Sequence, residues 1–228
     1  MGICPWEKVM TAYSELEAQI GCFDNCRKIH EKWISTYPES GKAWTEYAKF
    51  ESSLNEIEWA REIFKAAISM DLDSPEEVWK SFISFEIENS EVQNAWNLYL
   101  DLIEKTQHFK AYLNYAQFEL RHSGIEAARE VYWKAESVFR TKEKDARVLI
   151  FNAWLWFEEE SGQEETLQSL LELKPKKVRK RRKIKIIENG EEVDAGWEEF
   201  YDWQFPEEKQ APKRMKILDI AQKWKKDV

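Results

Sequence analysis

The amino-acid sequence contains an internal repeat of about 34 residues, which limits the possible folds more than any other feature. In each unit, an aromatic or apolar residue occupies positions 0, 3 and 6, and a glutamate follows at position 7. The first residues of the four clear units are Met10, Trp44, Trp79 and Tyr112. A second motif starts 16 residues later in every unit, with a small residue at Cys26, Ala60, Ala95 and Ala128. Two linked motifs with the same spacing predict a tandem array of similar structural units.

Each unit has the pattern of two amphipathic helices joined by a short turn. At about 100° per residue, positions 0, 3 and 6 lie on one side of a helix, and the second motif forms a similar stripe. Neither helix can bury its apolar side alone, so neighbouring pairs must stack. The chain has 7 Gly and 6 Pro, few for a protein of many strands. We therefore predict an all-α fold, an α-solenoid of antiparallel helix pairs with a less regular C-terminal tail.

The repeat also sets the expected domain boundaries. A solenoid should cover residues 1–173, with helix pairs near residues 6–38, 41–72, 76–105, 109–138 and 148–173. The fifth unit is predicted to be degenerate, because Trp154 and Phe157 fill its first two positions whereas Glu160 and Ser161 follow in place of the aromatic residue and the glutamate. Residues 174–187 are expected to form a basic linker, and residues 188–228 an acidic-aromatic segment and a terminal helix.

The composition limits the class of function. The formal net charge is −9, yet residues 174–228 contain 16 basic and 11 acidic residues, which is typical of a basic appendage that attracts polyanions. No apolar run approaches the roughly 18 residues of a membrane span, so we expect no membrane contact. The chain contains no P-loop, nucleophile elbow or H-E-x-x-H motif. We therefore expect no enzymatic activity, cofactor or small-molecule substrate.

Two groups of polar residues within the repeats have a structural and a chemical interpretation. Cys22, Cys26 and His30 are spaced four apart, as in half of a metal site, but Cys26 and His30 fall in the small-residue and aromatic columns, which favours core packing. The glutamates at position 7 fall inside the apolar stripe, where an unpaired charge is costly. We predict that Glu51 pairs with Arg61 of its own unit. Glu86 would then need another donor, since Trp96 occupies its arginine position.

The residues that define the repeat are expected to be structural rather than catalytic. They comprise the aromatic positions, the glutamates and the arginines of the second motif: Trp44, Tyr47, Glu51, Arg61, Trp79, Phe82, Glu86, Tyr115, Glu119 and Arg129.

A dense basic run follows the repeats, with nine Lys or Arg residues between Lys174 and Lys185. A solvated linker is one interpretation, because like charges repel each other. A nuclear-import signal or phosphate contact with RNA is the other, and the two functions are compatible. The candidate residues are Lys176, Lys177, Arg179, Lys180, Arg181, Arg182 and Lys183.

An acidic segment rich in aromatic residues comes next. Residues 188–208 contain nine Asp or Glu and no Lys or Arg, and a short helix is expected to start at residues 194–196 and end at Pro206. The rings should either cap the last repeat or dock into a partner, and both alternatives stay open. A terminal helix is expected from Pro212. The candidate cap or partner-binding residues are Trp197, Phe200, Tyr201, Trp203 and Phe205.

These motifs resemble a known family. The aromatic spacing followed by glutamate is similar to the half-a-TPR (HAT) repeat, and the segment Asp194-Ala-Gly-Trp-Glu-Glu199 resembles the C-terminal end of the crooked-neck-like pre-mRNA splicing factors. The resemblance covers the whole chain, although members of that family are much longer. It implies a non-catalytic nuclear scaffold of the spliceosome's NineTeen-associated core. Expected partners are further HAT-repeat and Myb-type splicing factors, with small nuclear RNA or pre-mRNA reached through the basic tail.

Two other functions remain as alternatives. A HAT-repeat scaffold of mRNA 3′-end processing or ribosomal-RNA maturation is the first, and the segment around Trp197 argues against it. The second is the helical α-subunit of a prenyltransferase, which would carry an Asn-Tyr-x-x-Trp-x-x-Arg repeat that this sequence lacks.

Overall fold

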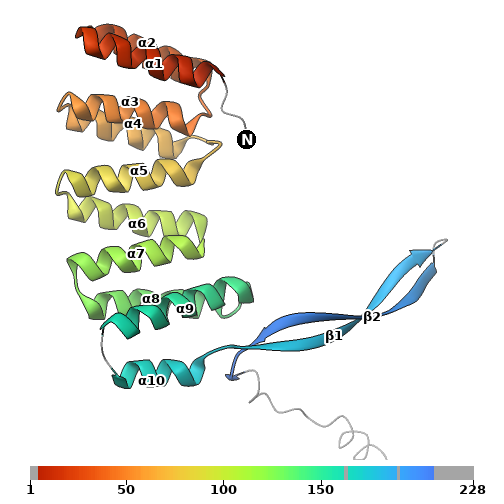
Figure 1. The fold of residues 1–228 in the computed structure, drawn as a ribbon. Helices are drawn as coiled ribbons and strands as arrows, with labels where there is room; N and C mark the ends of the chain where they lie inside the picture. Colours follow the sequence, from red (N-terminus) through yellow and green to blue (C-terminus); the bar gives the residue numbers. More distant parts are fainter. Residues whose placement is uncertain (1–4, 162–163, 189–190, 208–228) are drawn as a thin grey trace, which may run out of the picture. The chain divides into compact units, whose positions relative to one another are not determined.

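The computed structural model describes residues 5–161, 164–188 and 191–207. Over these residues, ten α-helices precede a two-stranded antiparallel sheet (Figure 1). The helices are α1 (Pro5–Ile20), α2 (Phe23–Thr36), α3 (Gly41–Ser53), α4 (Ile57–Ser69), α5 (Pro75–Glu88), α6 (Val92–Thr106), α7 (Phe109–His122), α8 (Ile125–Phe139), α9 (Lys144–Ser161) and α10 (Glu164–Leu173). The strands are β1 (Lys176–Glu188) and β2 (Glu191–Gln204). The predicted all-α solenoid of helix pairs is thus confirmed, with an addition at its C-terminal end.

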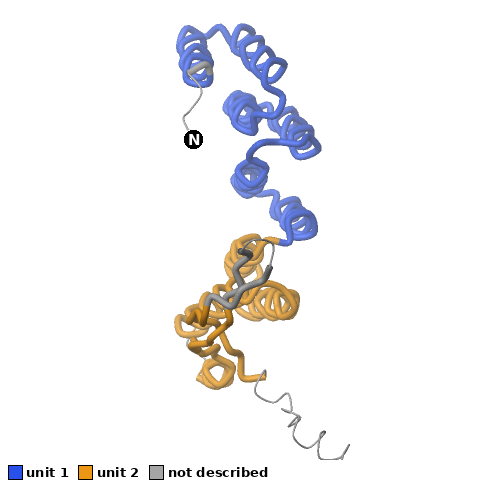
Figure 2. Tube along the Cα trace, turned by 90° about the vertical axis from the view of Figure 1, so that its right-hand side faces the viewer, with its two compact units in different colours: residues 1–107 blue, residues 108–228 orange. Residues whose placement is uncertain are grey.

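The chain divides into two compact units, residues 1–107 and 108–228 (Figure 2). The first unit contains the helix pairs α1–α2, α3–α4 and α5–α6, and the second contains α7–α8 and α9–α10 with the β1–β2 hairpin. The turns inside the first three pairs repeat one conformation, because Gly21, Asn55 and Ser90 all have positive φ angles of 85°, 65° and 63°. These residues end the first helix of each pair in the left-handed conformation that commonly terminates helices.

Aromatic contacts hold successive helix pairs together within each compact unit. A ring on the second helix of one pair stacks on the rings at positions 3 and 6 of the following pair, with centroid distances between 5.0 and 6.1 Å. Each such contact adds about 0.5–1.5 kcal/mol beyond the burial of apolar area. The contacts join His30 to Tyr47 and Phe50, Phe64 to Phe82 and Phe85, and Tyr132 to Trp154 and Phe157.

The fifth unit is more regular than the sequence alignment predicts. Trp154 and Phe157 occupy the second and third aromatic positions, and Glu158 occupies the glutamate position, with 1% of its surface exposed. Phe151, which is 3% exposed, therefore begins the unit. The prediction that Glu160 and Ser161 replace the third aromatic residue and the glutamate is wrong, because it places the unit three residues late. The shift arises from the extra residues between α8 and α9.

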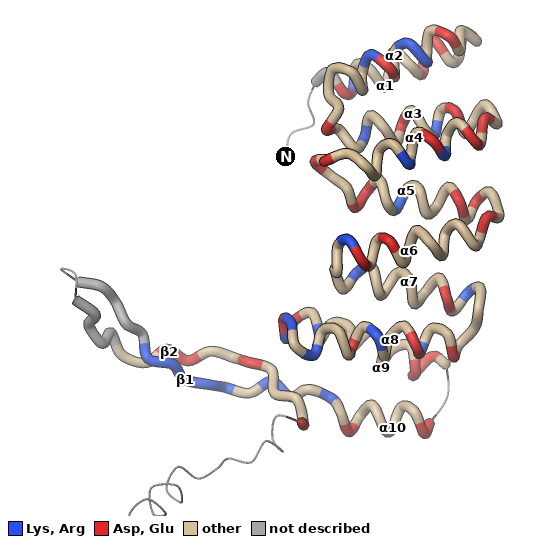
Figure 3. The backbone as a smooth tube through the Cα atoms, turned by 180° about the vertical axis from the view of Figure 1, so that it is seen from behind, with Lys and Arg blue, Asp and Glu red and all other residues tan. Residues whose placement is uncertain are grey.

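The C-terminal segment also differs from the prediction. Residues 174–187 do not form a linker, and no helix starts at residue 194, because β1 and β2 pair over their whole length from Lys176–Gln204 to Glu188–Glu191. The repulsion among the basic residues of β1 is offset by the carboxylates directly across the hairpin (Figure 3). The terminal helix expected from Pro212 lies outside the described residues.

Candidate interaction surfaces

Buried ion pairs link successive helix pairs. Each ion pair joins one sequence repeat to the next repeat, not two residues of the same repeat. The Arg27 guanidinium donates to both carboxylate oxygens of Glu51 at 2.9 and 3.0 Å. Arg61 binds Glu86 in the same way at 2.6 and 2.9 Å, and Arg129 binds Glu158 at 2.8 and 2.7 Å. The predicted pairing of Arg61 with Glu51 is therefore wrong. Each arginine reaches forward to the next unit instead of back across its own turn.

The glutamates in these pairs lose almost all contact with water. Glu51 and Glu86 are 0% exposed. Their burial is tolerated because a guanidinium satisfies both oxygens with parallel hydrogen bonds. The hydrogen bond with Glu86 is the main reason why the pKa of Arg61 is raised. The pairs therefore fix the position of one helix pair on the next, and with it the shape of the surface between them.

The surroundings of the buried Glu158 carboxylate favour its ionised form. Burial by itself would raise the pKa of Glu158, but hydrogen bonds from Arg129, Thr166 and Trp154 outweigh this effect and lower it. The Thr166 hydroxyl donates at 2.9 Å and the Trp154 indole at 3.2 Å. Glu158 thus joins α8, α9 and α10 through a charged group that stays ionised.

The pattern changes at the boundary between the two compact units. In α6, the position of the forward-reaching arginine is occupied by Trp96, and the following glutamate is Glu119 of α7. Burial raises the pKa of Tyr115, and a side-chain hydrogen bond with Glu119 adds to this shift. A tyrosine of the same helix thus contributes a hydrogen bond to this glutamate.

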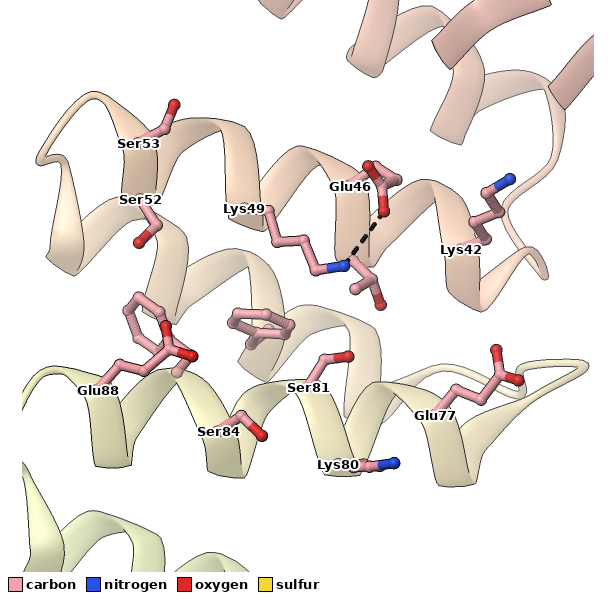
Figure 4. A pocket seen from close by; sticks show the side chains of 13 residues that line it. Lys42, Glu46, Lys49, Ser52, Ser53, Glu77, Lys80, Ser81, Ser84 and Glu88 are labelled. Atoms are coloured by element: carbon pink, nitrogen blue, oxygen red, sulfur yellow. Dashed lines mark hydrogen bonds and ion pairs between the residues drawn. The ribbon is translucent and has the colours of Figure 1, made fainter. Parts of the chain in front are cut away.

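A groove lies between α3 and α5 in the first unit, with a cavity volume of about 730 Å³ (Figure 4). Phe64 and Phe85 contribute apolar surface, and the remaining lining residues are polar or charged. Lys49 forms an ion pair with Glu46 at 3.3 Å inside the groove. The polar lining residues are Lys42, Thr45, Glu46, Lys49, Ser52, Ser53, Glu77, Lys80, Ser81, Ser84 and Glu88.

The groove has room because short side chains line it. Ser52 and Ser53 end α3, and Ser81 and Ser84 stand opposite on α5. Gly41 brings the start of α3 close to α5, since a Cβ atom there would lie 2.9 Å from Val78 Cγ2 and 3.2 Å from the Ser74 carbonyl oxygen. The sequence analysis did not single out these residues as a candidate site. Small polar residues between the aromatic positions of the repeat are a pattern that could have indicated the groove.

Two basic residues near the start of α9 hold the end of the hairpin. Arg147, which is 5% exposed, binds Glu136 and lies 2.6 Å from a carboxylate oxygen of Glu207. Its guanidinium also covers the ring of Phe205 at 3.8 Å, and Phe205 is 2% exposed. Lys144 donates to the Trp203 carbonyl oxygen at 3.2 Å. The base of the hairpin is therefore packed on the helices of its own unit.

The strand register divides the hairpin into two faces that differ in chemistry. Residues directly opposite each other in an antiparallel pair point to the same side. We call one side the odd-numbered face; it consists of Lys177, Arg179, Arg181 and Lys183 on β1 with Trp197, Glu199, Tyr201 and Trp203 on β2. The even-numbered face consists of Lys176, Val178, Lys180 and Arg182 with Glu198, Phe200, Asp202 and Gln204.

The candidate basic and aromatic residues are thus brought together on one hairpin. Trp197 and Tyr201 are exposed, at 63% and 67%, whereas Phe205 is buried and Phe200 and Trp203 are partly exposed. Among the repeat-defining residues, Tyr47, Trp79 and Phe82 belong to the core, and Trp44 and Tyr115 are partly exposed. Both the import or RNA role of the basic residues and the partner role of the rings remain predictions.

Cys26 and His30 have the surroundings of core residues, with 0% and 3% of their surfaces exposed. Cys26 is 0% exposed and its thiol contacts the Ser14 carbonyl oxygen at 3.4 Å, while Cys22 is exposed. Within the described chain, no group of three or more His, Cys, Asp or Glu side chains is arranged to hold a metal ion. No helix in that same part of the chain combines the length and apolar character needed to cross a bilayer.

Comparison with known proteins places these features in a family context. A family model described as the PRP39 N-terminal HAT repeat matches residues 5–113. Crooked neck-like protein 1 of Mus musculus is 40% identical over 231 residues, which covers 99% of this chain. The chain is a homologue of the crooked-neck-like proteins. Protein crooked neck of Drosophila melanogaster is 35% identical over 99% of the chain, and the pre-mRNA-splicing factor cwf4 of Schizosaccharomyces pombe is 32% identical over all of it.

The crooked-neck-like relatives are considerably longer than this chain. The match covers 33% of the Mus musculus protein and 36% of the Schizosaccharomyces pombe protein. The chain therefore spans about a third of the length of these relatives. The alignments nevertheless extend through the hairpin residues as well as the repeats, since they cover 99% or more of the chain.

The hairpin that carries these candidate residues is the element that sequence reasoning missed. The signal that could have found it is Asn189-Gly190, a dipeptide that favours two-residue hairpin turns, between a basic segment and an acidic segment of similar length. Opposite charges across such a turn indicate two strands that pair with each other.

Proposed function

We propose that the chain is an interaction scaffold in pre-mRNA splicing, which binds other proteins and catalyses no reaction. The observation that carries this proposal is the similarity to proteins named as pre-mRNA-splicing factors over nearly the whole chain. The α3–α5 groove supports it, because an open groove with a mixed charged and apolar lining can hold a segment of a partner chain. The buried ion pairs Arg27–Glu51 and Arg61–Glu86 support it further, because they hold α3 and α5, the two walls of the groove, in place.

The finer assignments follow from the same proposal. We expect the partners to be other spliceosomal proteins, including further HAT-repeat and Myb-type splicing factors, and the site of action to be the nucleus. The basic residues of β1 would serve nuclear import or contact small nuclear RNA or pre-mRNA. Their exposure supports this role, since the side chains of Arg179, Arg181 and Arg182 are 62%, 68% and 65% exposed.

Co-purification of the tagged full chain from nuclear extract tests the proposal. Mass spectrometry and RNA sequencing should identify splicing proteins and small nuclear RNAs. Recovery of cleavage factors or nucleolar proteins in their place would favour the alternative scaffolds, and a prenyltransferase β-subunit would point to an enzyme.

A pair of matched variants tests the role of the groove. Ser84 lines the groove on α5, whereas Ser137 is an exposed serine of α8 outside it. Ser84→Arg fills the groove with a long charged side chain and should deplete at least one splicing protein from the purified set. Ser137→Arg makes the same chemical change elsewhere and should leave the set intact. Equal sets from both variants would exclude the groove as the binding site.

A further inference from the structure

The odd-numbered face of the hairpin combines charge with exposed aromatic rings. Between Lys177–Trp203 and Lys183–Trp197, the register places four cations and the carboxylate of Glu199 on this face, and Glu199 forms ion pairs with both Arg179 and Arg181. Trp197 and Tyr201 are more than 60% exposed on this face. Exposed rings grouped on one face, rather than scattered singly, are typical of an interaction surface.

The even-numbered face serves as an internal comparison. Its cations are largely neutralised within the hairpin, because Lys180 binds Asp202 and Arg182 binds Glu198 at 2.7 Å. Asp202 also lies 3.6 Å from the Lys144 ammonium group of α9, and these two lysines lower its pKa. Two of the three cations on the even-numbered face are thus paired within the hairpin, and the face carries no ring as exposed as Trp197 and Tyr201 of the odd-numbered face.

The geometry of the odd-numbered face suits a nucleic acid strand. Tyr201 and Trp203 stand two residues apart on β2, which separates their side chains by about 7 Å, and Trp197 is four residues from Tyr201. The Lys183 ammonium lies 5.5 Å from the Trp197 ring centre and the Lys177 ammonium 5.1 Å from that of Tyr201. Both ammonium groups lie over the rings, so positive charge and aromatic surface are within reach of the phosphates and bases of one strand.

We propose that the odd-numbered face of the β1–β2 hairpin is a stacking platform for single-stranded RNA. This inference rests on the proposed RNA contact of the basic residues and specifies the form of RNA and the face. An acidic peptide would need only the cations and would leave the rings uncovered. Duplex RNA would also leave them uncovered, because its bases already stack on each other and its major groove is deep and narrow.

The test measures binding of the full chain to a fluorescent oligouridylate of about 10 nucleotides by anisotropy. The double variant Trp197→Ala/Tyr201→Ala should weaken binding at least about 5-fold, the smallest loss expected when stacking on even one base is removed. Phe200→Ala removes a ring from the even-numbered face and should leave the affinity unchanged. Trp197→Leu/Tyr201→Leu keeps bulky apolar side chains in the strand and should show the same loss as the alanine pair, and circular dichroism verifies that each variant is folded.

Charge variants separate the two faces in the same assay. Lys177→Gln/Lys183→Gln and Lys180→Gln/Arg182→Gln each remove two positive charges. Only the first pair should flatten the dependence of log affinity on log salt, by about 1.4, as expected for the loss of two phosphate contacts to a single strand.

Each contrary result has a defined meaning. Equal losses from both charge pairs, with no effect of the ring variants, would overturn the platform and leave RNA contact through charge alone. Tighter binding of a duplex of the same length, or displacement of the oligouridylate by polyglutamate at lower concentration than by unlabelled oligouridylate, would assign the face to another ligand. Absence of any RNA binding would also remove the proposed RNA contact, whereas the scaffold function depends on the separate co-purification result.

Discussion

Replacing Arg61 with methionine removes the positive partner of a carboxylate that has almost no contact with water. The Glu86 side chain is 1% exposed and receives hydrogen bonds from Arg61 at 2.6 and 2.9 Å and from Asn94 at 3.2 Å. Methionine keeps much of the apolar stem of arginine but provides no donor. Glu86 would then be held by Asn94 alone.

The expected cost follows from this burial. Breaking a buried ion pair by removing one partner destabilises a protein by about 3–5 kcal/mol, because the remaining charge stays buried. The Arg61 side chain is 13% exposed and Asn94 remains as a donor, so we expect the lower end, about 3 kcal/mol. That is a large fraction of the roughly 5–15 kcal/mol that stabilises a typical domain.

Urea unfolding of the full chain, followed by circular dichroism and tryptophan fluorescence, measures the effect. Lys65→Met is the matched control, since Lys65 lies on the same helix and pairs with Glu62 at 2.8 Å, but both side chains are more than half exposed. Such surface pairs contribute about 0–1 kcal/mol.

A double variant tests the cause of the loss. Glu86→Gln removes the buried charge, so Arg61→Met/Glu86→Gln should be more stable than Arg61→Met alone. If Arg61→Met cost no more than the Lys65 control, or if the double variant were the less stable one, the ion pair would not hold the two helix pairs together.

Two further predictions concern the first unit. Burial lowers the pKa of His30 below its usual 6.5, although Glu46 and Glu51 oppose the shift. The unfolded chain therefore takes up this proton first, so stability is fully present above about pH 6.5 and is lost as the pH falls toward the folded-state pKa. In thermal unfolding between about pH 7 and 5, His30→Phe should lose less stability than the unchanged protein, and equal losses would contradict this account. Gly41→Ala should cost about 1–3 kcal/mol in urea unfolding, because the added Cβ would overlap Val78 Cγ2, whereas a neutral or stabilising effect would show that α3 and α5 can separate without cost.

The helices were predictable because the pattern that defines each of them lies within a few consecutive turns of the chain. The 3.6-residue periodicity places Trp79, Phe82 and Phe85 on one side of α5, and all three are at most 5% exposed. On α1 the corresponding residues are open to solvent, with Tyr13 48% and Leu16 52% exposed, because within the described residues no helix pair packs against that face. Periodicity thus identifies which residues share a face, but the exposure of that face depends on its neighbours.

The candidate surfaces were less predictable because they depend on pairing between distant residues. By sequence, a glutamate at position 7 has two possible partners: an arginine 10 residues later in its own repeat, and another 24 or 25 residues earlier in the preceding repeat. The sequence allows both, and the stacking of helix pairs brings the second one into reach. The hairpin follows the same rule, since Lys180 and Asp202 are 22 residues apart and meet only after the strands pair.

The sequence alone therefore determined the repeat, the helix pairs and their apolar faces, since each depends on residues a few positions apart in one helix. Tertiary structure alone decided that Arg61 binds Glu86, that the fifth unit begins at Phe151, and that Trp197 and Tyr201 share a face with Lys177 and Lys183. The physical reason is that a helix or strand fixes the direction of its side chains, whereas the identity of the group they meet is set by the packing of separate elements.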